Sequence, residues 1–285
     1  MKHANLLRST IKNSEEIISK LEPPKIEGKT VVLYCNTGIG PARIYYWTLK
    51  ISGVENIELV DCVTAITNLL PYTDYDQVII WNNSTRDPNL VAAYQNSTLM
   101  NYPTRILTPI LSPALEEYFD PEDLIVFTDE SPYFTMSLAA LKWGVMGSMK
   151  KDLRMNRLND IVKEGFHESV GGLLEAYSSE LNFLQSITNS KGVLVMYTPP
   201  QLPAAIHHYL LDPIVAIPSH WSLRVGVRKT PYVVFYGTSV DEGYYKDLWY
   251  KLAGSRVTKI ILNVDPMTAP LYTMMLQGGV YGKLM

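Results

Sequence analysis

Short runs of apolar residues, each followed by turn residues and a helical pattern, recur along the whole chain. In the first half these runs occupy residues 30–35, 77–81 and 105–107. The matching runs of the second half occupy residues 192–197, 232–236 and 259–262. Continuous β-branched and apolar runs of this length are typical of parallel strands that are buried on both faces.

The two halves also share a short sequence match. Residues 132–136 are Pro-Tyr-Phe-Thr-Met, residues 270–274 are Pro-Leu-Tyr-Thr-Met, and each pentapeptide opens an apolar run. The second and third strand-like runs are spaced almost equally in the two halves. This order predicts an α/β fold with two doubly wound parallel-sheet domains, whose crossover helices cover both faces of each sheet.

The helical patterns set the expected domain boundaries. Apolar residues recur at helical spacing over residues 5–21, and Pro23 with Pro24 ends that pattern. The expected segments are an N-terminal helix in residues 1–28, a first domain in residues 29–145, a helical connector in residues 146–190, and a shortened second domain in residues 191–285.

Composition excludes several classes of partner. The formal net charge is −3, which gives no basic surface for nucleic acid. The chain contains no apolar run long enough to cross a membrane, and its start does not resemble a signal peptide. Cys35 and Cys62 do not form a Cys-x-x-Cys pair, so we expect no metal site. Free buried thiols in a reducing cytoplasm are the expected state.

Ligands of doubly wound sheets bind beyond the carboxyl ends of the strands, which selects a few loops. The first loop, residues 36–41, contains Gly38 and Gly40, whose small size allows a tight turn before a helix N-terminus. The same pattern fits an ordinary strand-to-helix turn. The dinucleotide fingerprint is incomplete because a third glycine is absent.

The second loop, residues 82–90, has six polar residues in succession. Asp87 before Pro88 is typical of a helix N-cap, and Arg86 is suited either to pair with an anion or to face water. The remaining amides and hydroxyls are suited to the oxygens of a small polar ligand. In the second half, residues 198–203 contain three prolines that lack N–H donors, so the first half is favoured for anion binding.

Two residues of the second half are candidates for proton transfer. His220 lies just before a basic strip, and histidine titrates near neutral pH. A surface histidine in a basic environment explains His220 equally well. Asp212 precedes Pro213, where helix termination is the simpler explanation.

Several loops resemble the SIS (sugar isomerase) domain family, which binds phosphosugars. Residues 82–90 are similar to its Ser-x-Ser-Gly-x-Thr-x-Glu-Leu loop, residues 36–38 to its Gly-Thr-Ser turn, and residues 131–138 to its Thr-Lys-Ser-Tyr-Thr-x-Gln-Leu helix start. The element order resembles that family over nearly the whole chain. This arrangement also resembles the isomerase half of glucosamine-fructose-6-phosphate synthase.

The resemblance implies an isomerase or deaminase of a small sugar phosphate, without cofactor or metal, in a cytoplasmic homodimer. It places Asp212 and His220 in the family's catalytic glutamate and histidine positions. The ligand-binding residues that it and the loop chemistry indicate are Thr37, Gly38, Asn82, Asn83, Ser84, Thr85, Arg86, Asp87 and Ser131.

Two alternatives stay open. A non-catalytic protein that binds a sugar phosphate or another small polar metabolite needs no titrating residue, and the absence of the family's C-terminal catalytic lysine favours it. A nucleotide-binding Rossmann enzyme is the third interpretation, for which Asp61 is only a partial candidate for the acid at the next strand end.

Overall fold

The computed structural model describes residues 3–187, 193–212, 216–218, 232–243, 245–246 and 256–285. The chain divides into two compact units, which we call the N-terminal unit (Asn13–Lys163) and the C-terminal unit (Met1–Lys12 with Glu164–Met285). These bounds differ from the expected segments, because the first part of the N-terminal helix and most of the expected connector belong to the C-terminal unit.

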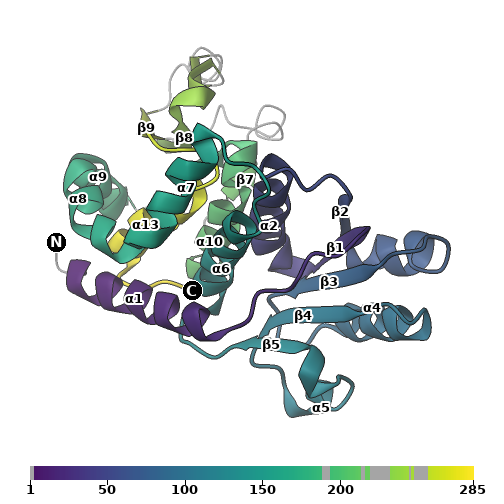
Figure 1. The fold of residues 1–285 in the computed structure, drawn as a ribbon. Helices are drawn as coiled ribbons and strands as arrows, with labels where there is room; N and C mark the ends of the chain where they lie inside the picture. Colours follow the sequence, from purple (N-terminus) through teal and green to yellow (C-terminus); the bar gives the residue numbers. More distant parts are fainter. Residues whose placement is uncertain (1–2, 188–192, 213–215, 219–231, 244, 247–255) are drawn as a thin grey trace. The chain divides into compact units, whose positions relative to one another are not determined.

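The N-terminal unit is built on a five-stranded parallel sheet in the order β2-β1-β3-β4-β5 (Figure 1). Its strands are β1 (Thr30–Cys35), β2 (Ile57–Asp61), β3 (Gln77–Asn82), β4 (Thr104–Pro109) and β5 (Leu124–Phe127). The edge strand β5 was not predicted, whereas β2 is the strand whose end Asp61 was expected to mark. All four residues of β5 are apolar, but the run is short and three of the four are only half-buried.

Helices cover both faces of this sheet. The helices and short turns of the first 164 residues are α1 (Ala4–Lys20), η1 (Asn36–Gly38), α2 (Ile39–Ile51), α3 (Cys62–Thr64), η2 (Ala65–Leu69), α4 (Pro88–Leu99), α5 (Pro113–Glu116), η3 (Pro121–Asp123), α6 (Pro132–Met146) and α7 (Leu153–Glu164). The side chains of alternate residues of β3 point to opposite faces of the sheet. Ile80 joins the apolar core beneath Leu90 of α4, whereas Trp81 packs between Tyr45 of α2 and Trp143 of α6.

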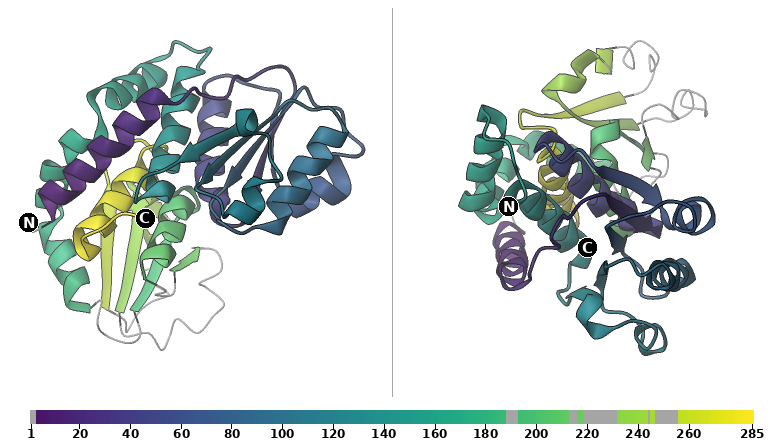
Figure 2. Two further views of the ribbon diagram at one scale, coloured as in Figure 1. Left: turned by 90° about the horizontal axis from the view of Figure 1, so that it is seen from below. Right: turned by 45° about the vertical axis from the view of Figure 1, so that its right-hand side comes forward.

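The C-terminal unit contains a second parallel sheet in the order β7-β6-β8-β9. Its described strands are β6 (Val193–Tyr197), β7 (Ala216–Pro218), β8 (Tyr232–Thr238) and β9 (Arg256–Leu262). Its other described elements are α8 (Phe166–Ala176), α9 (Ser178–Ile187), η4 (Pro199–Gln201), α10 (Leu202–Leu211), η6 (Ser239–Asp241) and α13 (Ala269–Tyr281) (Figure 2). Parallel α/β architecture is therefore confirmed in both units.

The shared pentapeptide has a structural basis. Pro132 opens α6 directly after β5, and Pro270 lies in the first turn of α13 after β9, so each match begins the helix that follows the last described strand of its sheet. Both helices are buried along most of their length. Proline suits the first turn because that position needs no N–H donor.

The cysteines correct the expectation of free thiols. Cys35 ends β1, Cys62 opens α3 after β2, and the two form a disulfide with a Cα–Cα distance of 5.3 Å. Because 27 residues separate the two cysteines, their spacing in the sequence did not indicate that they pair. The parallel pairing of β1 with β2 brings the two strand ends together.

Candidate functional site

The candidate site lies at the carboxyl edge of the N-terminal sheet, where strand order reverses. From β1 the chain crosses to β2 on one side and returns to β3 on the other, so the loops after β1 and β3 diverge. Such a reversal leaves a crevice between neighbouring loops, the usual ligand position in open α/β sheets. Cys35 pairs with Asn82 at this edge, which places η1 beside the loop that leads to α4.

Glycine brings these two loops close together. A Cβ atom added to Gly38 would lie only 2.3 Å from the backbone oxygen of Trp81. The backbone of η1 therefore rests directly on β3, and no larger residue fits without a shift. Asn36 enters the turn with φ of 52°, a left-handed conformation that asparagine tolerates better than most residues.

A side-chain hydrogen bond joins the two loops. Asn83 Nδ2 donates to Thr37 Oγ1 over 3.1 Å, and both side chains are half-buried. Ser84 lies next in the loop, and its Oγ accepts from the backbone N–H of Arg86 at 3.3 Å. Both hydroxyl oxygens thus act as acceptors within the protein, which leaves each O–H able to donate to a ligand.

Asn82 shapes the loop from within. Its side chain is fully buried, and Nδ2 donates to the Ser84 carbonyl at 2.6 Å and to Thr108 Oγ1 at 3.0 Å. Its Oδ1 accepts from the Ser84 N–H at 3.2 Å. With these groups engaged inside the protein, Asn82 holds the loop in place, whereas its neighbours Asn83 and Ser84 are half-buried.

Asp87 is the N-cap of α4, as the sequence indicated. Its Oδ1 accepts from the Asn89 N–H at 3.0 Å, and only 5% of the residue is exposed. Thr85 and Arg86, which lie just before it, are exposed. The negative charge of Asp87 is therefore directed at the N-terminus of α4, where the helix dipole stabilises it.

Ser131, the remaining predicted residue of this unit, precedes α6 and is buried. A cluster that the sequence did not reveal lies beside it. Asp129 Oδ2 accepts hydrogen bonds from the hydroxyls of Ser14 and Thr135, and the two hydroxyl oxygens lie 2.7 Å apart. Burial raises the pKa of Asp129, although these hydrogen bonds oppose the shift. The link to Ser14 spans 115 residues, which no sequence motif signals.

In the C-terminal unit the corresponding crevice is occupied by the protein's own carboxylate. Asp241 Oδ2 accepts from the Thr238 N–H at 2.7 Å, from Thr238 Oγ1 at 2.8 Å and from Thr198 Oγ1 at 3.3 Å. Thr198 follows β6 and Thr238 ends β8, so these donors flank the reversal in this sheet. Asp241 and Thr238 together form a capping box at the start of η6, so these donors are satisfied within the protein.

The two predicted acid–base residues belong to the C-terminal unit. Asp212 is the C-cap of α10, and its N–H donates to the His208 carbonyl at 2.9 Å. Because α10 leaves the carboxyl edge of the sheet and runs back along it, Asp212 lies at the amino edge. His220 lies outside the described residues.

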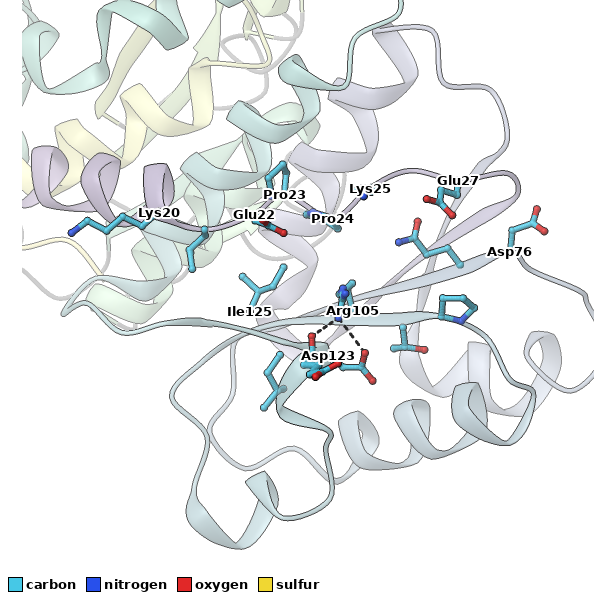
Figure 3. A pocket seen from close by; sticks show the side chains of 16 residues that line it. Lys20, Glu22, Pro23, Pro24, Lys25, Glu27, Asp76, Arg105, Asp123 and Ile125 are labelled. Atoms are coloured by element: carbon cyan, nitrogen blue, oxygen red, sulfur yellow. Dashed lines mark hydrogen bonds and ion pairs between the residues drawn. The ribbon is translucent and has the colours of Figure 1, made fainter.

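A cavity of about 490 Å³ lies at the opposite edge of the N-terminal sheet, where β3, β4 and β5 begin (Figure 3). Arg105 in this cavity already pairs with Asp123 at 3.2 Å and donates to the Glu122 carbonyl. Its mixed charges and its distance along the strands from the loops described above separate it from the candidate site.

Within the described ranges, no group of three or more His, Cys, Asp or Glu side chains is arranged to hold a metal ion. In the same part of the chain no helix is long and apolar enough to span a membrane.

Comparisons with known proteins locate the fold. No family model matches the sequence, and a search of curated proteins finds no match. Solved structures do match. The C-terminal domain of glucosamine-fructose-6-phosphate aminotransferase from Francisella tularensis is 14% identical, with a TM-score of 0.61 over 99% of this chain and 93% of that one.

Two further structures are similar over comparable lengths. Glucosamine-6-phosphate deaminase from Thermotoga maritima is 12% identical, with a TM-score of 0.57 over 99% of this chain and 93% of that one. A protein described as a phosphosugar isomerase, from Clostridium difficile 630, is 13% identical, with a TM-score of 0.67 over 99% and 90%. These likenesses confirm the sugar isomerase-like fold that the sequence predicted.

Proposed function

We propose that the N-terminal unit binds a small sugar phosphate in the crevice between η1 and the loop that follows β3. The hydrogen bond from Asn83 to Thr37 carries this proposal, because it joins the two loops at the strand-order reversal. Similarity of fold to proteins named for phosphosugars supports the choice of ligand class.

The chemistry of the crevice suits an oxyanion. The hydroxyls of Thr37 and Ser84 accept hydrogen bonds from the protein and keep their own hydrogens for a ligand. The N-terminus of α2 adds a favourable partial charge, and its N-cap residue Gly38 has no side chain that would block approach. Arg86 supplies a full positive charge at the exposed side of the loop.

We further propose, from the family resemblance alone, that the protein isomerises or deaminates a sugar phosphate with Asp212 and His220 of the C-terminal unit as acid–base groups. The protein would act without a cofactor as a homodimer in the cytoplasm. The non-catalytic alternative has a specific observation in its favour. Residues 13–163 contain no histidine, so the unit with the crevice lacks the usual proton-transfer side chain.

Calorimetric titration tests the binding claim. We expect fructose 6-phosphate or glucosamine 6-phosphate to bind, inorganic phosphate to compete, and unphosphorylated fructose to bind far more weakly. Thr37→Val and Ser84→Ala each remove one donor and should lower affinity about five- to tenfold, since one such bond contributes ~1–1.5 kcal/mol. Thr98→Val, which removes an exposed hydroxyl near the end of α4, is the matched control.

Turnover distinguishes the two functions. An isomerase or deaminase should convert one of these sugar phosphates, and Asp212→Asn should abolish the conversion while binding persists. Binding without conversion by the wild-type protein would favour the sensing role. If neither variant of the crevice weakens binding, the ligand lies elsewhere.

A further inference from the structure

A chain of buried polar side chains crosses the C-terminal unit. Tyr197 of β6 contacts His208 of α10, with 2.5 Å between the Tyr197 hydroxyl and His208 Nδ1. His208 Nε2 lies 2.9 Å from the hydroxyl of Tyr281 at the end of α13. Gln277, one turn earlier in α13, contacts both Tyr197 and His207. In such a network, the partners of each group determine which atom donates the hydrogen and which atom accepts it.

The amide group of Gln277 determines the direction of the first hydrogen bonds in this chain. Its Nε2 lies 3.0 Å from the carbonyl oxygen of Ala204 and 2.8 Å from the Tyr197 hydroxyl. Only the NH₂ end of the amide can donate to a backbone carbonyl, so the amide orientation is settled by chemistry. Gln277 Oε1 therefore faces His207 Nδ1, over 2.6 Å.

That orientation determines the tautomer of His207. Its Nδ1 must carry the hydrogen that Gln277 Oε1 accepts, and its Nε2 accepts from the Met285 N–H at 3.3 Å. His207 is consequently neutral. Burial lowers its pKa to about 3, which agrees with the neutral form.

The direction continues through Tyr197 to Tyr281. Tyr197 accepts one amide hydrogen of Gln277, so its own O–H donates to His208 Nδ1. Burial lowers the pKa of His208 to about 4, so the ring carries one hydrogen, on Nε2, and donates it to the Tyr281 oxygen. Each hydrogen in the chain points towards Tyr281.

Tyr281 is the outward end of this chain. Tyr281 is half-buried, and among the described residues its own O–H group has no hydrogen-bond acceptor. Asp212 follows His208 by four residues on α10, which places the two on one side of the helix end. Burial and the charge of Asp212 both raise the pKa of Tyr281, so the phenol keeps its hydrogen.

We propose that Tyr281 and Asp212 form a subsite for a hydroxyl group of a sugar or another small polyol. A hydroxyl can accept the oriented hydrogen of Tyr281 and donate its own to the Asp212 carboxylate, whereas a phosphate oxygen would meet like charge. His208 and Tyr197 are positioning residues that hold the phenol as a donor. This subsite stands independently of the phosphate crevice in the N-terminal unit.

Ring-nitrogen NMR of ¹⁵N-histidine-labelled full-length protein tests the tautomers. We expect Nδ1–H for His207 and Nε2–H for His208, both neutral at pH 7. Tyr197→Phe should release His208 from the single tautomer and leave a mixture. A dominant Nδ1–H signal for His208 in the wild-type protein would overturn the assignment.

Titration with D-fructose and, separately, fructose 6-phosphate tests the subsite through the His208 signals. We expect at least one sugar to shift them saturably in the wild-type protein and in Tyr209→Phe, which alters an exposed phenol on the same helix. Tyr281→Phe should lose at least nine-tenths of the shift while keeping the wild-type His207 signals. No shift with either sugar, or an equal shift in Tyr281→Phe, removes the subsite.

The two proposals fail separately. Failure of the phosphate crevice leaves backbone signals of η1 unchanged by fructose 6-phosphate, whatever the His208 signals do. Failure of the hydroxyl subsite leaves the His208 signals unchanged, whatever occurs at η1.

Discussion

Strand order reverses at equivalent places in the two sheets, but the polar groups at the two reversals have different hydrogen-bond partners. In the C-terminal unit, Asp241 gathers three donors from Thr198 and Thr238 onto one carboxylate oxygen. In the N-terminal unit, Thr37 and Ser84 accept bonds from inside and keep their hydrogens. An internal carboxylate completes one crevice, and an external oxyanion is suited to complete the other. On the proposed function, the protein's own carboxylate closes the first reversal, and the second is open to the ligand.

Low pH should produce the largest difference in stability between the two units. His207 and His208 have folded-state pKa values lowered by burial to about 3 and about 4, from 6.5. The unfolded chain therefore binds more protons, and stability falls as pH drops below 6.5. The expected loss is on the order of 2–3 kcal/mol per histidine by pH 4.5.

The N-terminal unit should respond in the opposite direction at Asp129. Burial raises the folded-state pKa of Asp129, so protonation as pH falls through that value favours the folded state. Hydrogen exchange of α10 and α13 against β1 and β3, measured from pH 7 to pH 4.5, reports both units in one sample. Equal loss of protection in the two units would contradict the assignment.

Reduction should act mainly on the N-terminal unit, because the disulfide between Cys35 and Cys62 closes a loop there. A separation of 27 residues corresponds to about 3–4 kcal/mol of stabilisation through the restricted unfolded chain. Cys62→Ala should lower the free energy of unfolding of that unit by this amount in a urea titration. A reductant should have the same effect on the wild-type protein and none on the variant. Two titratable thiols in the unfolded, unreduced protein would show that the bond is absent.

Removing the internal carboxylate should open the closed crevice. Asp241→Ala leaves the Thr238 N–H and two threonine hydroxyls without their acceptor, at a cost of about 2–3 kcal/mol. Inorganic phosphate should recover part of that loss, because its oxygens can accept the same donors. We expect added phosphate to raise the Tm of the C-terminal unit, followed at β8, in the variant only. An equal response from the wild-type C-terminal unit would mean that Asp241 does not occupy an anion position.

The sequence predicted the layered scaffold well because buried parallel strands leave continuous apolar runs. It also located the start of α4, since Asp87 and Pro88 lie where a helix must begin. It did not reveal the roles of Asn82 and Asp129. Both depend on partners brought near by folding, Thr108 for the first and Ser14 for the second. Residue type and spacing carry no record of such pairings, so loop position is more predictable than the direction of each side chain.

The smallest effect should come from one methyl group at the open crevice. Gly38→Ala places a Cβ 2.3 Å from the Trp81 oxygen, so η1 must shift, at a cost of about 1–3 kcal/mol. The shift moves Thr37 away from Asn83, and affinity for a sugar phosphate should fall with it. Gly172→Ala in α8 is the matched control, because the added Cβ there meets no neighbour within 4 Å.

That control should raise stability by up to ~1 kcal/mol, since alanine favours helix more than glycine does. Urea unfolding and ligand titration of both variants therefore give effects of opposite sign on stability, and a loss of binding in Gly38→Ala alone. If Gly38→Ala binds as tightly as the wild-type protein, close contact between η1 and β3 is not what forms the site. The difference between the two crevices would then depend on Asp241 alone.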